Sequence, residues 1–280
     1  MFGGHTLQKE VNPMKCSQCN SRNIVLNGKY KIYQKYKCKD CGTQFSERSL
    51  SFYYRHRFPD EVIRNSVLLS MFASTRYVKF IVSETMNFIV SHVSVFNWSS
   101  KFAHLLSKLQ RSRSFSNIWH VDEKFIRVRG SKDDFAYLWV VIDDKNNIIA
   151  THVSNNRDIN SARTVLRKAK QNAERPPDII VTDGLQAYKR ACMAVFGRKT
   201  KHAIRHFEAE GIMHQGRLYY LSNNRIESLN SKINLWYKKF RGFKSLASAR
   251  LWTEMFSFFY NYMRPRIIKH KIISIHQILM

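Results

Sequence analysis

The most constraining feature of this 280-residue chain is a series of short apolar segments in its second half. Stretches rich in β-branched and aromatic residues, separated by turn-forming residues, predict three antiparallel strands over 119–128, 135–142 and 147–153. Helical spacing of apolar residues predicts a helix from about Asn160 to before Pro176. The wholly apolar Ile179–Val181 then predicts a strand buried on both faces. An α/β fold with a mixed sheet flanked by helices is the expected result.

Three acidic residues fall where such a fold can bring them together. Asp122 lies within the first expected strand, and Asp183 follows the apolar strand. Glu227 lies in the first turn of a helix that Ser222 or Asn223 opens. Neighbouring strand ends share one crevice, and a helix laid across it can supply a third ligand. Carboxylates that hold two divalent cations can promote attack of a water or a 3′-hydroxyl on a phosphodiester. We therefore expect these three residues to be catalytic metal ligands.

The helix that carries Glu227 is expected to be amphipathic. Its buried stripe is formed by Ile226, Leu229, Ile233 and Trp236, and its polar face by Asn223, Glu227, Asn230, Asn234 and Lys238.

Other carboxylates compete for the metal-binding role. Glu123 follows Asp122 on the strand and should point to the opposite face, so it is not expected to share the metal. Glu208 and Glu210 are the rivals for the third position.

The charge of the chain restricts its partners. It holds 47 Lys and Arg against 20 Asp and Glu, a formal net charge of +27, which favours a polyanion such as DNA. A hydrophobic content of 44% indicates a folded core rather than a disordered basic tail. Neither an apolar leader nor a membrane-spanning stretch is apparent, and no amphipathic basic helix or lipidation motif points to a membrane surface. We expect a cytoplasmic, nucleoid-associated protein.

Four of the five cysteines form two pairs. Cys16 and Cys19 make one Cys-x-x-Cys, Cys38 and Cys41 the other, and eighteen residues separate the pairs. This spacing is typical of a four-cysteine zinc ribbon, in which one structural Zn2+ is bound by four thiolates. Two disulfides are the alternative, and they would require an oxidising compartment.

The segment between the cysteine pairs is rich in lysine. Read as one strand, 29–37 alternates, and its polar face consists of Lys29, Lys31, Tyr33, Lys35 and Lys37. Such a face suits a DNA phosphate backbone. The alternative is a solvated edge strand that its lysines protect from pairing with another chain.

Residues 58–110 are expected to be helical and to contain a helix-turn-helix. Asp60 and Ser74 are candidate N-caps, 74–82 the first helix, 83–87 the turn and 90–102 the second helix. Val95, Trp98 and Phe102 should be buried. Ser94, Asn97 and Lys101 would then face DNA as a recognition helix does. A plain helical linker bundle is the alternative.

Together these motifs resemble the DDE transposases of bacterial and archaeal insertion sequences, in particular the insertion sequence 6 family. The matching blocks lie in order between about 58 and 264: Trp119–Glu123, Ser154–Asp158, Thr182–Asp183 with Ala187–Tyr188, Asn223–Glu227, and Phe240–Ser245 with Ala249–Arg250. The resemblance implies a ribonuclease H-like core that binds Mg2+ or Mn2+ through Asp122, Asp183 and Glu227. It also implies nicking of double-stranded DNA at the element's terminal inverted repeats, joining of the 3′-hydroxyls to target DNA, and a homo-oligomer on DNA.

The chain departs from the family pattern in two ways. Forty-three residues separate Asp183 from Glu227, which exceeds the usual gap, and the excess is expected in 206–220. The basic residue that the family tends to place seven positions after the glutamate is Asn234 here. Lys232 or Lys238 is the candidate to take over its phosphate contact.

The expected organisation is a zinc ribbon (14–48), a helix-turn-helix region (58–110), a ribonuclease H-like DDE domain (117–262) and a basic tail (263–280), with a serine-rich basic linker at 110–116. Two other functions stay open. One is a DNA-binding regulator whose degenerate core only binds DNA. The other is a nuclease of the same fold that does not transpose.

Overall fold

The computed structural model describes residues 14–30, 33–46, 53, 56–109, 114–205, 209–263, 267–268 and 271–272. Lys31, Glu208, residues 110–113 of the expected linker and most of the expected basic tail lie outside these ranges. The chain divides into two compact units, residues 1–64 and 65–280. Within the described residues, every helix is too short or too polar to cross a bilayer.

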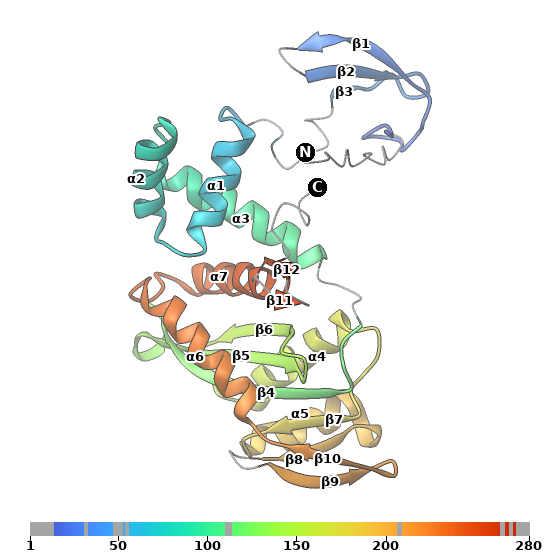
Figure 1. Ribbon diagram of the computed structural model, residues 1–280, viewed down its shortest axis with the longest axis vertical. Helices are drawn as coiled ribbons and strands as arrows, with labels where there is room; N and C mark the ends of the chain where they lie inside the picture. The colour runs from blue at the N-terminus through green and yellow to red at the C-terminus, as the bar shows by residue number, and fades with distance from the viewer. Residues whose placement is uncertain are drawn as a thin grey trace, which may run out of the picture. The chain divides into compact units, whose positions relative to one another are not determined.

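The first unit contains a three-stranded antiparallel sheet, drawn in blue in Figure 1. Its strands are β1 (Ile24–Tyr30), β2 (Tyr33–Cys38) and β3 (Gln44–Ser46). The expected single strand over 29–37 is wrong, because the chain reverses between Tyr30 and Tyr33, which pair with each other. Alternation of side chains has the same period before and after a tight reversal, so the pattern alone does not locate the turn.

This hairpin separates the lysines that were expected on one face. Lys35 and Lys37 alternate with Tyr36 and Cys38, which belong to the small core of this unit, so the two lysines lie on the face opposite that core. Lys29 instead pairs with Gln34 and lies on the other face. The expected stripe is therefore reduced, in the described residues, to Lys35 and Lys37.

Three helices follow: α1 (Asp60–Ser70), which spans the boundary between the units, α2 (Thr75–Met86) and α3 (His92–Leu109). Ser74 is the N-cap of α2, as expected, whereas Asp60 is the first residue of α1 rather than its cap. The expected turn at 83–87 is wrong. Helix α2 continues to Met86, through most of the segment that was expected to be the turn. Asn87, with a left-handed φ of 56°, then ends the helix.

The second unit is built on a five-stranded mixed sheet of order β6-β5-β4-β7-β8 (Figure 1). The strands are β4 (Ile118–Arg127), β5 (Phe135–Asp143), β6 (Ile148–Ser154), β7 (Ile179–Thr182) and β8 (Lys201–Ile204). The first three are antiparallel, and β7 runs parallel to both β4 and β8. The expected meander, the helix after it and the buried fourth strand are thus confirmed, in the order of a ribonuclease H-like fold.

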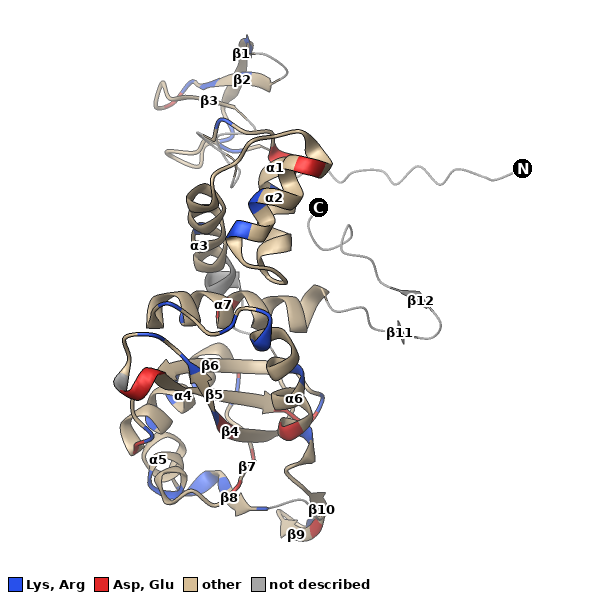
Figure 2. Ribbon diagram, turned by 90° about the vertical axis from the view of Figure 1, so that its left-hand side faces the viewer, with Lys and Arg blue, Asp and Glu red and all other residues tan. Residues whose placement is uncertain are grey.

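Helices cover both faces of this sheet (Figure 2). On one face, α4 (Ile159–Asn172) and α5 (Gln186–Phe196) bury a core around Trp119 and Trp139. On the other, α6 (Asn224–Lys238) and α7 (Leu246–Phe258) bury a core around Ile126 and Val140. Asp158 caps α4 by accepting a hydrogen bond from Ser161 N. Each face of β4 is therefore enclosed by helices.

The interval between Asp183 and Glu227 holds α5, β8 and a hairpin that the sequence analysis did not identify. Its strands, β9 (Glu210–His214) and β10 (Arg217–Leu221), pair antiparallel, and Leu221 packs with Ile179 and Val181 of the sheet. Short helical turns occur at η2 (Lys132–Asp134), η3 (Gly197–Lys199) and the π-helix η4 (Phe259–Met263), and the strands β11 (Ile267–Ile268) and β12 (Lys271–Ile272) pair near the C-terminus.

Candidate functional site

The structure brings Asp122 and Asp183 together at the carboxyl end of β7. Asp122 lies on β4, which pairs in parallel with β7, and Asp183 is the residue directly after β7. Ligand oxygens of Asp122, Glu123 and Asp183 all lie within 4.8 Å of one another. Hard divalent cations prefer carboxylate oxygens, so this donor set fits such an ion. The first two carboxylates of the expected triad thus lie close together.

Glu123 is part of this acidic cluster, which the sequence analysis did not expect. Its side chain does point to the α5 side of the sheet, where Tyr188 donates a hydrogen bond to Oε2. Arg157, from the loop between β6 and α4, binds Oε1 through Nε at 2.6 Å. Burial, followed by the charge of Glu123, raises the pKa of Tyr188 well above its usual value. Both oxygens of Glu123 therefore already have partners, and one of these partners is a cation.

Asp122 is the electrostatically unfavourable member of the cluster. Burial, then the charges of Glu123 and Asp183, raises its pKa from 3.8 to about 7. Its Oδ1 accepts a hydrogen bond from Glu123 N at 2.9 Å, and its Oδ2 accepts one from Asn230 Nδ2 at 2.6 Å. Carboxylates that repel one another in a partly buried site offer a strong negative potential to a cation.

Glu227 lies on the helix that crosses the site, but its carboxylate is outside the acidic cluster among the described residues. Asn230, one turn further along α6, is the residue that contacts Asp122. Of the two rival residues, Glu210 lies on β9 and pairs with Arg205 at 3.3 Å, while Glu208 is outside the described residues. The structure thus brings Asp122 and Asp183 of the expected triad together. The third member, Glu227, lies on α6, one turn before the residue that contacts Asp122.

The basic residues near α6 are arranged differently from one another. Lys124 of β4 donates from Nζ to Asn230 O at 3.0 Å and to Asn234 Oδ1 at 2.6 Å. The ammonium of Lys232 instead lies over the ring of Tyr260, 5.8 Å from its centroid, and Lys238 is exposed. Sequence analysis missed Lys124, although its place two residues after Asp122 puts it on the same face of the strand.

The repulsion at Asp122 has a measurable consequence for stability. A carboxyl whose pKa is 3.8 in the unfolded chain and about 7 in the folded protein destabilises the fold increasingly as pH rises from about 4 to 7. At 1.36 kcal/mol per pKa unit the full penalty is on the order of 4 kcal/mol. We expect Asp122→Asn to raise the melting temperature of the metal-free protein at pH 8 and to leave it nearly unchanged at pH 4. Thermal unfolding at both values measures this, and equal or lower stability of the variant at pH 8 would contradict it.

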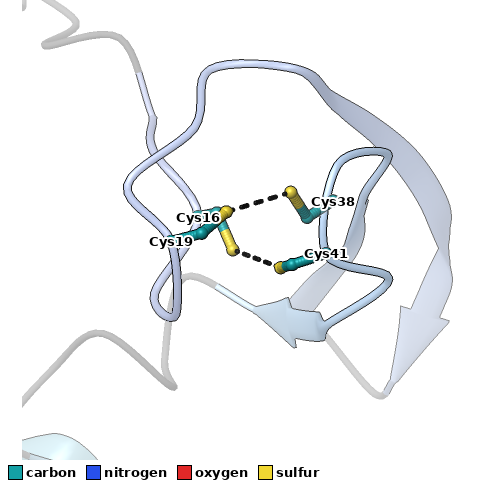
Figure 3. Close-up of side chains that lie close together, drawn as sticks. All are labelled: Cys16, Cys19, Cys38 and Cys41. Carbon is teal, nitrogen blue, oxygen red and sulfur yellow. Dashed lines mark hydrogen bonds between the residues drawn. The ribbon is translucent and has the colours of Figure 1, made fainter.

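The side chains of Cys16, Cys19, Cys38 and Cys41 lie close together in the N-terminal unit (Figure 3). Cys16 Sγ lies 3.5 Å from Cys41 Sγ, and Cys19 Sγ lies 3.6 Å from Cys38 Sγ. All four sulfur atoms lie within 4.8 Å of one another, and none is in a disulfide. Zn–S bonds of about 2.3 Å in a tetrahedron require sulfur separations close to these. The cluster therefore fits a zinc ribbon.

The residues expected to read DNA lie on α3 as the helical period predicts. Val95 and Trp98 are buried, whereas Phe102, which was also expected to be buried, is half-buried. Asn97 and Lys101 are exposed and Ser94 is half-buried. A cavity of about 800 Å³ lies near the start of this helix, between α2, α3 and the turn that joins α6 to α7. Its lining includes five basic side chains: Arg76, His92, Lys239, Arg241 and Lys244.

Residues 116–265, more than half of the chain, match a family model described as a DDE domain. No curated protein matches the chain.

Three of the solved structures that are similar to the chain come from viral proteins. One is the simian T-cell lymphotropic virus intasome in complex with PP2A regulatory subunit B56 gamma, at 17% identity and a TM-score of 0.34, covering 51% of this chain and 50% of that one. Another is the HTLV-2 integrase catalytic core domain in complex with magnesium, in its trimeric form. Its sequence identity is 13% and its TM-score is 0.39, and the match covers 58% of this chain and 96% of that one. The dimeric form of the same domain has a sequence identity of 14% and a TM-score of 0.35, and the match covers 56% of this chain and 94% of that one. The chain spans half the length of the simian virus chain.

Proposed function

The chain belongs to the DDE domain family, and on that premise we propose that it is a DNA transposase of the insertion sequence 6 family. It nicks DNA at the terminal inverted repeats of its element and joins the 3′-hydroxyls to target DNA. The observation that carries this proposal is the meeting of the Asp122 and Asp183 carboxylates inside the matched domain. The net charge of +27 supports DNA as the partner and association with the nucleoid.

Asp122, Asp183 and Glu227 are the proposed ligands of the catalytic Mg2+ or Mn2+. When bound, two such ions supply electrostatic stabilisation to the attacking and leaving oxygens of the phosphodiester. Asn230 fixes the orientation of Asp122 through its 2.6 Å hydrogen bond. Arg157 and Tyr188 bind the two oxygens of Glu123 on the α5 side of β4, and the guanidinium of Arg157 balances the charge of Glu123.

The test of this function is an assay with DNA ends that carry the inverted repeats expected beside the gene. We expect the purified protein to nick the ends and to join pre-cut ends to plasmid DNA, in both cases only with Mg2+ or Mn2+. A DNA-binding regulator would leave the DNA unchanged after the metal is added. A nuclease would cut the DNA and give no joined product.

The proposed division of DNA contacts gives a further prediction. Ser94, Asn97 and Lys101 would read base edges, whereas Lys35 and Lys37, together with Lys29 and Lys31, would hold phosphates. Replacing both Lys35 and Lys37 with Ala should lower the slope of log affinity against log salt by up to about two units on any DNA. Asn97→Ala should cost on the order of 1–3 kcal/mol on the terminal repeat and little on random DNA. Equal losses of Asn97→Ala on both DNAs would exclude α3 as a recognition helix.

A further inference from the structure

Lys124 is a cation fixed beside the acidic cluster by neutral acceptors. Its Nζ donates to the main-chain oxygen of Asn230 and to the side-chain oxygen of Asn234, at 3.0 and 2.6 Å. Among the described residues it forms no ion pair, in contrast to Arg157 and Lys168, whose charges are neutralised by Glu123 and Glu254. The charge of Lys124 is therefore available to a ligand.

The geometry also leaves a hydrogen-bond donor. A lysine ammonium carries three N–H groups, and the described acceptors use two of them. The strand places Lys124 on the same face as Asp122, and Asn230 contacts both residues. An anion bound by Lys124 would thus lie next to the carboxylate that is the proposed metal ligand.

A half-buried lysine held in this way is costly without an anionic partner. Removing a charge from water costs free energy unless an opposite charge or hydrogen bonds replace the solvent. Two asparagine oxygens nevertheless fix the ammonium in place, and asparagine at 234 removes the competing cation that the insertion sequence 6 resemblance implies there. One positive charge therefore lies beside Asn234, and it comes from Lys124 of β4 instead of from a residue of α6.

We propose that Lys124 binds a phosphate of the DNA strand that enters the acidic cluster, next to the phosphodiester that reacts. This rests on the proposed function and deepens it, because it names the residue that positions the DNA strand. Lys232 is a poorer candidate, since it lies over Tyr260 on the side of α6 away from Asn230 and Asn234. Lys238 lies one turn beyond Asn234 and is exposed, so its charge is screened more strongly by solvent.

The experiment compares variants that move one charge. Lys124→Gln keeps a donor for the two asparagine oxygens but loses the charge. We expect it to slow cleavage of a duplex that carries the terminal repeat about 10- to 100-fold, as for loss of a charged hydrogen bond. It should also lower the salt slope of binding to that duplex by about one unit. Adding Asn234→Lys to this variant returns an ammonium to the same place and should restore most of the rate and the slope.

Two further variants serve as controls. Lys124→Arg keeps the charge and should recover most of the rate that Lys124→Gln loses. Lys145→Gln removes a charge from the exposed turn between β5 and β6 and should leave the rate unchanged. Far-ultraviolet circular dichroism verifies that each variant is folded. A wild-type rate and slope for Lys124→Gln, or failure of Asn234→Lys to rescue a folded Lys124→Gln protein, would overturn the proposal. If the wild-type protein itself cleaves nothing, the proposed function fails, and the binding slopes alone decide the role of Lys124.

Discussion

Replacing Asp183 with Asn should reduce strand cleavage and strand joining by about a thousandfold or more, with DNA binding retained. A metal ligand that stabilises charge in the transition state contributes several kcal/mol, and each 1.36 kcal/mol is a factor of ten in rate. Removing a negative charge from a site that receives phosphates should, if anything, tighten DNA binding. Single-turnover cleavage with Mg2+, measured beside an equilibrium binding titration, separates the two effects.

Glu227→Gln should give a loss of the same size, although Glu227 lies outside the acidic cluster of the described residues. Glu210→Gln is the matched control, because Glu210 is an exposed acid in the same interval of the chain, paired with Arg205. Its activity should equal that of the wild type. The reverse result, an active Glu227→Gln and an inactive Glu210→Gln, would transfer the third ligand to the hairpin.

We expect the four-cysteine cluster to bind one structural Zn2+, whose removal should unfold the N-terminal sheet and leave the DDE domain folded. The buried core of this sheet consists of Cys16, Cys38 and Phe45, which is far too small to stabilise a fold of this length by itself. Structural zinc sites of this kind contribute about 10–16 kcal/mol of apparent binding free energy at pH 7, and that energy is folding energy. Elemental analysis should find one zinc per chain, and chelation or Cys38→Ser should collapse the amide dispersion of residues 14–46 in NMR spectra.

The DDE domain provides the internal control for that experiment. Its two cores around the mixed sheet contain no residue of the cysteine cluster, so its melting temperature should not change after chelation. An N-terminal sheet that stays folded without metal, or protein that contains no zinc when purified, would contradict a structural zinc site.

Four of the five strands of the mixed sheet, β4 to β7, were predictable because each carries its own local signal. The alternation in 119–153 and the uniformly apolar Ile179–Val181 are explained by burial on one or both faces of a sheet. Helix α5 had a signal as well, since Tyr188, Ala191, Cys192 and Val195 recur at helical spacing and are all buried, but it was overlooked. Strand β8 and the β9–β10 hairpin are too short for a period to be recognised.

The acidic cluster was predictable only in part, because a period defines a face and not the reach of a side chain. It correctly assigned Asp122 and Glu123 to opposite faces of β4, yet both carboxylates approach Asp183. The contacts of Glu123 with Arg157 and Tyr188 join three segments that lie far apart in the sequence. Position 124 follows the same face as Asp122, but nothing in the local sequence shows that its ammonium reaches Asn234.

The most direct test of the central claim is anomalous X-ray diffraction at the manganese absorption edge, from crystals grown with Mn2+ and a pre-cut duplex of the terminal repeat. The proposed mechanism requires that Asp122, Asp183 and Glu227 bind the ions that act on the phosphodiester. We expect manganese peaks between the Asp122 and Asp183 carboxylates, with Glu227 turned toward them and the 3′-end of the duplex beside them. Manganese bound only elsewhere on the protein, with these carboxylates unliganded and the duplex in place, would contradict it.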